Sequence, residues 1–267
     1  MKLRYSAFAE WQNCRRKYDL QYVQGWRKPE TVPSKAEIGT LVHAGLKAYY
    51  LNEDHKLGVL NAVPALHCID GKELTDAVSL AQIMVEGYIQ WQEEEGLDCG
   101  WEVLLTEKQL EYKITPGVIL TGQVDLVVRD GVGQTWLVDH KTCQSFSQYT
   151  TMLSMNQQLM WYTLLLKANG IDVDGAQFNM LRRVKRGPRA TPPFYAREEV
   201  RFSGRQLDKF KSRVLNQIEE MQQSAVPPRP TQDCSWRCPF VNVCPEFDNG
   251  GYAEEMLQDQ FIKEGNA

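Results

Sequence analysis

The cysteines constrain the fold of this chain most, because three of them lie close together near its end and a fourth lies near its start. Cys234, Cys238 and Cys244 follow a Cys-x3-Cys-x5-Cys pattern, and Cys14 stands far upstream. Sites with four thiolates hold zinc or an iron–sulfur cluster, and the spacing alone leaves both open. We therefore predict a four-cysteine cluster that ties the two ends of the chain together.

The other three cysteines, Cys68, Cys99 and Cys143, show no ligand spacing, so we interpret them as structural thiols. The opening residues lack the apolar stretch of a secretory signal. This indicates a cytoplasmic protein, where cysteines are more often free thiols or metal ligands than disulfides. Because no apolar run approaches the ~18 residues that span a bilayer, we expect no membrane partner.

Charge limits the ways in which this chain could bind nucleic acid. Its 267 residues carry a net charge of −4, which argues against a protein that coats nucleic acid through general positive charge. Binding would depend on local basic patches that contact phosphates. The sequence offers two candidates, which are Arg15, Arg16 and Lys17 near the start and Arg182, Arg183, Lys185, Arg186 and Arg189 in a later turn.

The hydrophobic pattern changes from helical spacing to alternation and back, which predicts an α/β fold with a mixed central sheet flanked by helices. We interpret residues 52–74 as a loop or insertion, because Gly58, Pro64 and Asp70-Gly71 interrupt any period. The predicted helices cover 5–23, 34–50, 75–95, 149–169 and 203–224, and the predicted strands cover 101–112, 118–129, 134–140, 174–183 and 195–202.

An acid and a lysine share one face of the third predicted strand. Leu137, Asp139 and Lys141 alternate with residues that point the other way. Charged groups beside a core are costly unless they are paired or bind a metal. The alternative is a surface salt bridge between Asp139 and Lys141, with no role for Asp125.

The preceding strand supplies a second acid, Asp125. If Gly131-Val132-Gly133 is a three-residue hairpin loop, Asp130 pairs with Gln134 and Asp125 lies opposite Asp139. Opposed residues of an antiparallel pair point to the same face. A two-residue turn would instead place the two acids on opposite faces. We predict the three-residue loop.

Two adjacent carboxylates repel each other unless a cation lies between them. Oxygen ligands favour Mg²⁺ or Mn²⁺, and such an ion activates water and offsets charge on a phosphate. Beside two acids, Lys141 is expected to stay protonated. We therefore interpret Lys141 as a residue that orients water and stabilises the transition state, with a general base as the weaker reading.

Several motifs follow one another along the chain in a specific order. They are Gly39-Thr-Leu-Val-His43, Gly122-Gln-Val-Asp-Leu-Val127, Leu137-Val-Asp-His-Lys-Thr142 and Gln158-Leu-Met-Trp-Tyr162. Together they resemble the motifs of the PD-(D/E)XK nucleases, and most closely those of the RecB-type branch, which includes CRISPR-associated RecB-like exonucleases. The Tyr5–Tyr18 segment and the late cysteines resemble the iron–sulfur motifs of that branch.

The resemblance implies a restriction-endonuclease-like core and a role for each matching residue. Asp125, Asp139, Lys141, Gln158 and Tyr162 would be catalytic, and His43, Asp125, Asp139 and the backbone carbonyl of His140 would bind the metal. Glu107 is a candidate accessory acid. The resemblance also favours a [4Fe-4S] cluster on Cys14, Cys234, Cys238 and Cys244, with zinc as the alternative.

The expected function is that of a Mg²⁺- or Mn²⁺-dependent DNA exonuclease acting on single strands or duplex ends, in DNA processing, recombination or repair. The alternative is a DNA-binding or scaffold subunit of a CRISPR-adaptation or helicase–nuclease complex. Any helicase partner would be a separate protein, because this chain has no phosphate-binding loop motif. We predict one domain over 1–267, with a mainly helical part over 1–100, a nuclease core over 101–202, a helix and cysteine region over 203–247 and a polar tail over 248–267.

Overall fold

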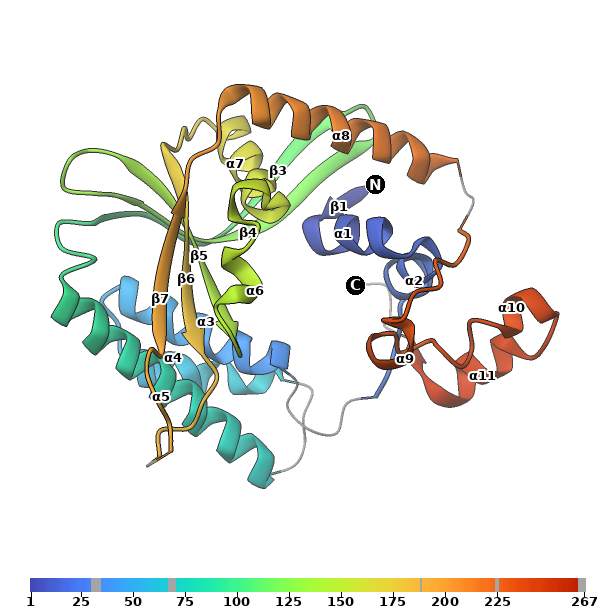
Figure 1. Ribbon diagram of the computed structural model, residues 1–267, viewed down its shortest axis with the longest axis horizontal. Coiled ribbons are helices and arrows are strands. Elements are labelled where there is room, and N and C mark those ends of the chain that lie inside the picture. Colours follow the sequence, from blue (N-terminus) through green and yellow to red (C-terminus); the bar gives the residue numbers. More distant parts are fainter. Residues whose placement is uncertain (30–34, 67–70, 188, 224–225, 264–267) are drawn as a thin grey trace. The chain divides into compact units, whose positions relative to one another are not determined.

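Two compact units make up the protein in the computed structural model (Figure 1). Unit 1 consists of Met1–Pro29, Ile114–Val118 and Ser212–Ala267, and unit 2 consists of Glu30–Lys113 and Ile119–Lys211. The single domain predicted over 1–267 stays a prediction. The structure describes residues 1–29, 35–66, 71–187, 189–223 and 226–263.

A twisted mixed sheet forms the centre of unit 2 (Figure 1). Its strand order is β4-β5-β6-β7, and β3 also pairs with β4. The β4–β5 and β6–β7 pairs are antiparallel, whereas β5 and β6 run parallel, and their connection contains a helix as parallel pairing requires. This confirms the predicted α/β class with a mixed sheet. The strands are β3 (Glu102–Thr115), β4 (Val118–Arg129), β5 (Thr135–Cys143), β6 (Gly175–Arg182) and β7 (Tyr195–Val200).

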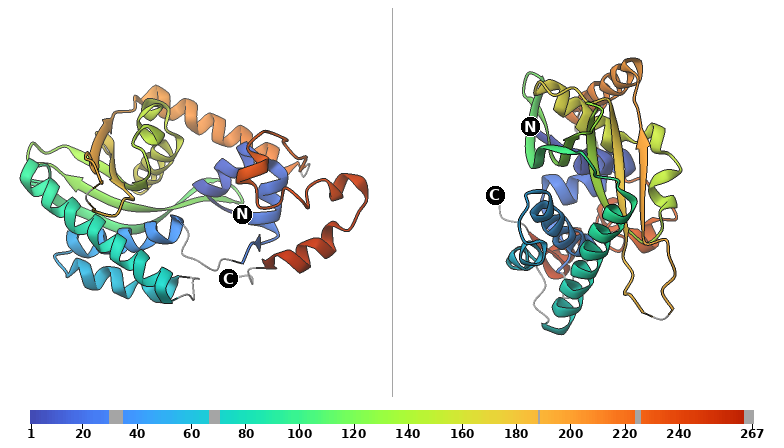
Figure 2. Two further views of the ribbon diagram at one scale, coloured as in Figure 1. Left: turned by 60° about the horizontal axis from the view of Figure 1, so that its bottom comes forward. Right: turned by 90° about the vertical axis from the view of Figure 1, so that its left-hand side faces the viewer.

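Helices cover both faces of this sheet (Figure 2). On one face α3 (Lys35–Tyr50), α4 (His55–Asn61) and α5 (Gly71–Glu95) enclose a core that includes Leu46 and Tyr88. The other face carries α7 (Gln157–Ala168), which buries Leu159, Trp161 and Leu165, and the short α6 (Ser147–Thr150) precedes it. Asp125 on β4 and Asp139 and Lys141 on β5 therefore lie in a sheet that is packed on both sides.

Local capping explains where α7 begins. The Asn156 side chain accepts a hydrogen bond from the backbone N–H of Leu159 at 3.0 Å, which satisfies one of the free donors of the first turn. Gly170, at φ +80°, ends the helix. The prediction of one helix over 149–169 is wrong in its first part, because α6 and a 3-10 turn at Leu153–Met155 precede the cap.

The loop predicted over 52–74 is also wrong in part, because it contains α4 and the start of α5. The Asp54 carboxylate caps α4 by accepting from the backbone N–H groups of Lys56 and Leu57 at 2.8 and 3.2 Å. Gly58, read as a loop signal, instead permits close helix packing, since a Cβ there would lie 2.6 Å from the Cβ of Ala48 on α3. Residues 67–70, with Cys68, lie outside the described residues.

Unit 1 brings the two ends of the chain together. β2 (Trp26–Arg27) pairs antiparallel with β8 (Ile262–Lys263). A small core joins Leu20 to Phe240 and Phe261, whose rings stack at 4.8 Å. The predicted polar tail contains α11, which buries Leu257. The remaining elements are β1 (Lys2–Arg4), α1 (Tyr5–Asn13), α2 (Arg15–Tyr18), a π-helical turn (Asp19–Val23), α9 (Cys234–Arg237), α10 (Glu246–Asn249) and α11 (Ala253–Gln260).

The long helix α8 (Gly204–Gln222) crosses the boundary between the two units. Over the residues that the structure describes, no helix has both the length and the apolar character that crossing a membrane requires.

Candidate active site

The two acids predicted to face each other come from adjacent strands in the predicted register. β4 pairs with β5 from Leu126 opposite Val138 to Arg129 opposite Thr135, so Asp125 and Asp139 directly follow the last pair of this ladder. The register follows from the turn, where the backbone N–H of Asp130 donates to the carbonyl of Gln134 at 2.9 Å. Gly133 adopts φ +87°, a conformation that favours glycine. The three-residue loop is therefore confirmed.

Asp125 belongs to a compact group of three possible metal ligands in unit 2. The His43 Nδ1 atom lies 3.3 Å from Glu107 Oε1 and 3.4 Å from Asp125 Oδ1. Over the described residues, these three side chains form the one group of histidine, cysteine or acidic ligands whose donor atoms all lie within 4.8 Å of one another. The sequence had suggested Glu107 only as an accessory acid, and the structure puts it directly beside His43.

Glu107 sits in an unusual backbone conformation. Its φ of +47° is left-handed within strand β3, and non-glycine residues seldom adopt it. Such strain is often found at functional sites, where the surrounding structure maintains it. The Gln123 amide donates to Glu107 Oε2 at 2.5 Å and so orients the carboxylate. The sequence indicated Glu107 only weakly and gave Gln123 no role, because only the pairing of β3 with β4 brings the two residues together.

Asp139 and Lys141 form a second, buried pair on β5. The Lys141 Nζ atom lies 2.5 Å from Asp139 Oδ2, and the two side chains are 15% and 2% exposed. This is not the exposed salt bridge considered from the sequence. The sharing of one metal ion by Asp125 and Asp139 stays a prediction.

Burial and neighbouring charges lower the pKa of Asp125 and raise those of Asp139 and His43. Burial opposes ionisation of Asp125, but the charge and hydrogen bond of His43 outweigh it and lower the Asp125 pKa. Burial raises the pKa of Asp139 to about 6 against the charge of Lys141. For His43, burial is outweighed by Asp125 and Glu107, which raise its pKa well above the usual value. The His43 imidazolium thus supplies the positive charge between two carboxylates that a cation could replace.

The pKa of Lys141 is raised as well. Burial disfavours its charge, but the neighbouring carboxylates of Asp139 and Asp125 outweigh that effect. The lysine therefore stays an ammonium group at neutral pH, as the sequence predicted, and is a donor rather than a base in this state.

His140 contributes its backbone rather than its ring. Its N–H donates to Asp125 Oδ2 at 2.8 Å. Its ring is buried against Tyr50, stacked at 5.7 Å, and burial lowers its pKa to about 3, so the imidazole is neutral. The proposed metal contact of the His140 carbonyl stays a prediction.

Gln158 and Tyr162 lie on one face of α7, as their spacing of four residues predicts. The Gln158 amide donates to the Tyr162 hydroxyl at 3.2 Å. Burial and the charge of Asp139 raise the pKa of Tyr162 to about 12, against the charge of Lys141. A cleft of about 520 Å³ is lined by Tyr162 and the three possible ligands, together with Ala36, Gly39, Thr40, Ala44, Lys47 and Gln123. Lys47 had no signal in the sequence.

The four predicted cluster cysteines line one cavity of about 340 Å³ in unit 1. Cys14 interrupts the predicted helix over 5–23, because its backbone is extended at φ −159° between α1 and α2. The Arg16 guanidinium lies 3.6 Å from Cys244 Sγ, and the backbone N–H of Thr231 lies 3.4 Å from Cys234 Sγ. Burial raises the pKa of Cys238. Of the other thiols, Cys143 is buried and Cys99 is exposed.

The basic patches are largely engaged in contacts within the protein. Arg15, Arg16 and Lys17 form ion pairs with Glu220, Asp248 and Glu10 at 2.6, 2.7 and 2.9 Å. In the later turn, the Arg182 guanidinium donates to the carbonyls of Thr191 and Pro193, and Lys185 pairs with Asp76. Phosphate binding by these residues stays a prediction.

Comparisons with known proteins show the family of the chain. The family model described as PD-(D/E)XK nuclease superfamily matches residues 3–245, so the chain belongs to that superfamily. A protein from Eubacterium rectale assigned as an exonuclease shares the fold at a TM-score of 0.54 and 12% identity, over 89% of this chain and 86% of that one. An alkaline exonuclease from Laribacter hongkongensis matches at a TM-score of 0.34 and 11% identity, over 71% of this chain and 93% of that one. No curated protein sequence matches the chain.

Proposed function

We propose that this nuclease is a metal-dependent exonuclease that hydrolyses phosphodiester bonds in DNA. One observation carries the proposal, which is that His43, Glu107 and Asp125 gather three ligand atoms beside a cleft, with the ammonium group of Lys141 next to Asp139. With a cation bound, this constellation would present two positive charges, the cation and the Lys141 ammonium group, to a phosphate group. Membership of the superfamily supports the same chemistry.

The donor set suits Mg²⁺ or Mn²⁺ through its two carboxylates, which supply the hard oxygen ligands that these ions prefer. His43, Glu107 and Asp125 would hold the ion, and Asp139 is the further side chain that we assign to it. Binding would require His43 to give up its proton, so affinity should rise with pH. When bound, the cation offsets negative charge on the phosphate and makes water a better nucleophile.

The chain's own residues then orient the reacting groups. Lys141 is held by Asp139 at 2.5 Å and carries the positive charge that would stabilise the pentavalent phosphate. The buried hydroxyl of Tyr162, fixed by Gln158, is a hydrogen-bond donor at the same cleft. The hydrogen bond from the His140 N–H leaves one oxygen of Asp125 directed at His43.

For the cysteine cavity we favour a [4Fe-4S] cluster over zinc. A tetrahedral zinc with Zn–S distances of about 2.3 Å needs sulfur atoms roughly 4 Å apart. Among the described residues, no three cysteine sulfurs lie within 4.8 Å of one another. The cavity also has apolar walls that include Leu20, Phe240 and Val241, which suits a sheltered cluster. Iron, sulfide and zinc analysis of anaerobically purified protein separates the two.

The proposed substrate, partner and location follow from the assignment as a DNA exonuclease. We assign single-stranded DNA or duplex ends as substrate, with phosphate-dominated binding that weakens strongly with salt. We propose a separate helicase or CRISPR-adaptation protein as partner and the cytoplasm as location. A non-catalytic DNA-binding scaffold is the competing outcome of the test below.

The test is cleavage of labelled linear and circular DNA, single- and double-stranded, with Mg²⁺, Mn²⁺ or neither. Wild type is compared with Asp125→Asn and Lys141→Ala, and with Lys56→Ala as a control at an exposed lysine of α4. We expect linear DNA to be degraded only with metal, and activity to be lost in the two site variants alone. Binding without cleavage in wild type would favour the scaffold, and equal cleavage by all four proteins would mean a different site or a contaminant.

A further inference from the structure

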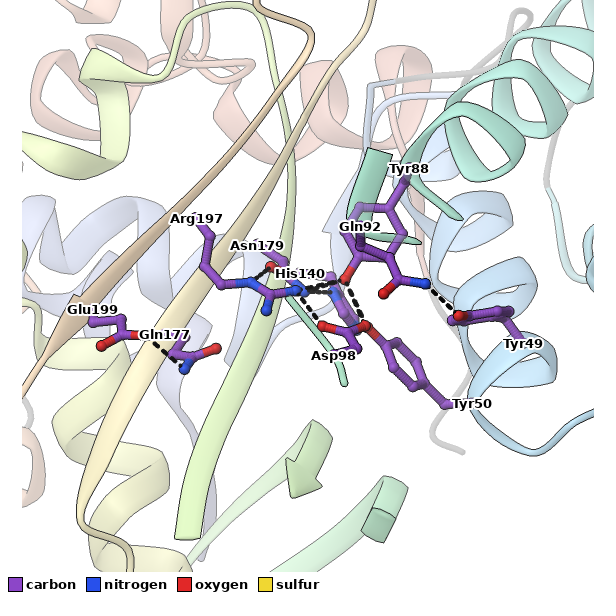
Figure 3. Close-up of polar contacts among 10 residues, drawn as sticks. All are labelled: Tyr49, Tyr50, Tyr88, Gln92, Asp98, His140, Gln177, Asn179, Arg197 and Glu199. Atoms are coloured by element: carbon purple, nitrogen blue, oxygen red, sulfur yellow. Dashed lines mark hydrogen bonds and ion pairs between the residues drawn. The ribbon is translucent and has the colours of Figure 1, made fainter. Parts of the chain in front are cut away.

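A row of polar residues crosses three neighbouring strands of unit 2 (Figure 3). Its last member, His140, donates its backbone N–H to Asp125 of the candidate metal site. In the sheet register His140 on β5 lies beside Asn179 on β6, which lies beside Arg197 on β7. The Arg197 Nε atom donates to Asn179 Oδ1 at 2.7 Å, and the Asn179 amide lies 3.4 Å from His140 Nδ1. The three side chains thus form one connected line.

Tyr88 on α5 connects this row to a buried ion pair. Its hydroxyl receives hydrogen bonds from Asn179 at 2.8 Å and Arg197 at 2.9 Å, and it lies 2.6 Å from the Tyr50 hydroxyl. Arg197 also pairs with Asp98 at 2.7 Å, and Tyr50 donates to the second oxygen of Asp98 at 2.8 Å. Figure 3 shows these contacts converging between the sheet and the helices.

The network is almost fully removed from water. Asn179 and Tyr88 are 0% exposed and His140 is 3% exposed, while the side chains of Arg197 and Asp98 are 8% and 10% exposed. A buried ion pair is weak as a source of stability, because apolar residues of the same volume often stabilise a fold equally well. A fully connected polar network does, however, hold its members in one arrangement.

The network acts on the site through His140. The ring of His140 is fixed from one side by Asn179 and stacked on Tyr50, and the backbone N–H of the same residue holds Asp125 Oδ2 at 2.8 Å. A neighbouring polar pair on the same strands, Gln177 and Glu199, bonds at 3.0 Å but lies beside the apolar Val138. The position of a polar pair along the strands therefore decides whether it meets the site.

We propose that Asp98, Arg197, Tyr88 and Asn179 are positioning residues that fix His140 and, through its N–H, the carboxylate of Asp125. This inference rests on the proposed function, because the readout is the metal that Asp125 binds. The positioning role predicts that loss of one hydroxyl from the network weakens metal binding, although that hydroxyl does not contact the metal.

The experiment measures Mn²⁺ affinity by calorimetry, with thermal stability recorded for each protein. Tyr88→Phe removes the central hydroxyl, and Tyr195→Phe is the matched control, since its hydroxyl contacts the Met84 carbonyl in the same core but not the row. We expect Tyr88→Phe to weaken Mn²⁺ binding about tenfold, as outer partners of metal ligands do, and Tyr195→Phe to leave it unchanged. Saturating Mn²⁺ should restore DNA cleavage by Tyr88→Phe.

If Tyr88→Phe does not fold, Tyr50→Phe replaces it, because it keeps the stacking on His140 and removes the bonds to Tyr88 and Asp98. Unchanged Mn²⁺ affinity in the folded variant, or an equal loss in Tyr195→Phe, would overturn the positioning role. Asp125→Asn tests the proposed function separately. If wild type does not bind Mn²⁺, or if Asp125→Asn binds it equally well, the proposed metal site is wrong, and the positioning role is wrong with it.

Discussion

The acidic site of unit 2 and the cysteine cavity of unit 1 are both candidate metal centres, but they are built in opposite ways. In unit 2, Asp125 and Glu107 lie on paired strands, and hydrogen bonds from Gln123 and the His140 backbone orient them. In unit 1, the cysteines lie at a helix break, on the short α9 and in turns, and line an open cavity. The comparison suggests that the first site is held by the fold, whereas the second helps to hold the fold.

The largest expected effect concerns Lys141, whose ammonium group is fixed by Asp139. We expect Lys141→Ala to lower kcat by about 10²–10³-fold, the usual loss when a donor to a charged transition state is removed. Steady-state cleavage assays at saturating Mn²⁺ measure this, and Lys56→Ala serves as the control. A variant that retains wild-type kcat would remove Lys141 from the chemistry.

The cysteine cavity should behave differently when one ligand is lost. Cys244→Ser is expected to destabilise unit 1 by about 2–5 kcal/mol, as loss of a long-range crosslink does, and to leave Mn²⁺ affinity unchanged because the Mn²⁺ donors all lie in unit 2. Denaturant titration and metal analysis follow the two effects, with the exposed thiol variant Cys99→Ser for comparison. Wild-type stability together with full iron content would contradict this assignment.

Thiol reactivity offers a finer comparison between the two units. Burial raises the pKa of Cys143 to about 11, so near pH 8 it holds roughly two orders of magnitude less thiolate than a free cysteine. Cys14 and Cys244 are only half-buried and should react quickly in protein treated with a chelator to remove the proposed cluster. Mass spectrometry after timed alkylation measures the labelling rate of each cysteine. Cys143 labelled as fast as Cys14 in the stripped protein would show that unit 2 does not protect its thiol.

The smallest expected effect tests whether unit 2 can lose stability while the proposed cluster in unit 1 keeps its iron. Asn156→Ala removes the cap of α7 and should cost about 1 kcal/mol of stability at unchanged iron content. Chemical denaturation monitored by circular dichroism measures the loss. No change in stability would mean that the cap is dispensable, and loss of iron would mean that the two centres are coupled.

Local signals in the sequence were sufficient to predict the β4–β5 hairpin and its register. Asp130 and Gly133 impose the turn, the turn sets the register, and the register pairs Leu126 with Val138, the direct neighbours of Asp125 and Asp139. These steps involve neighbouring residues, so pattern and spacing contain the necessary information. The same holds for the strand predicted over 118–129, which matches β4.

Other features depend on contacts that the sequence does not display. Glu107 enters the site through a left-handed conformation in β3, and no local pattern announces it. The row from His140 to Arg197 exists only because β5, β6 and β7 are neighbours in the sheet. The helix α4 was missed because Gly58 served close packing rather than a turn.

The central claim is that His43, Glu107 and Asp125 bind a divalent cation near Lys141. The most direct measurement is anomalous X-ray scattering from crystals of the protein soaked with Mn²⁺. The account predicts a peak at about 2.0–2.3 Å from His43 Nδ1 and from one oxygen each of Glu107 and Asp125, and loss of that peak in Asp125→Asn. A strong peak elsewhere in unit 2, or none at saturating Mn²⁺, would contradict it.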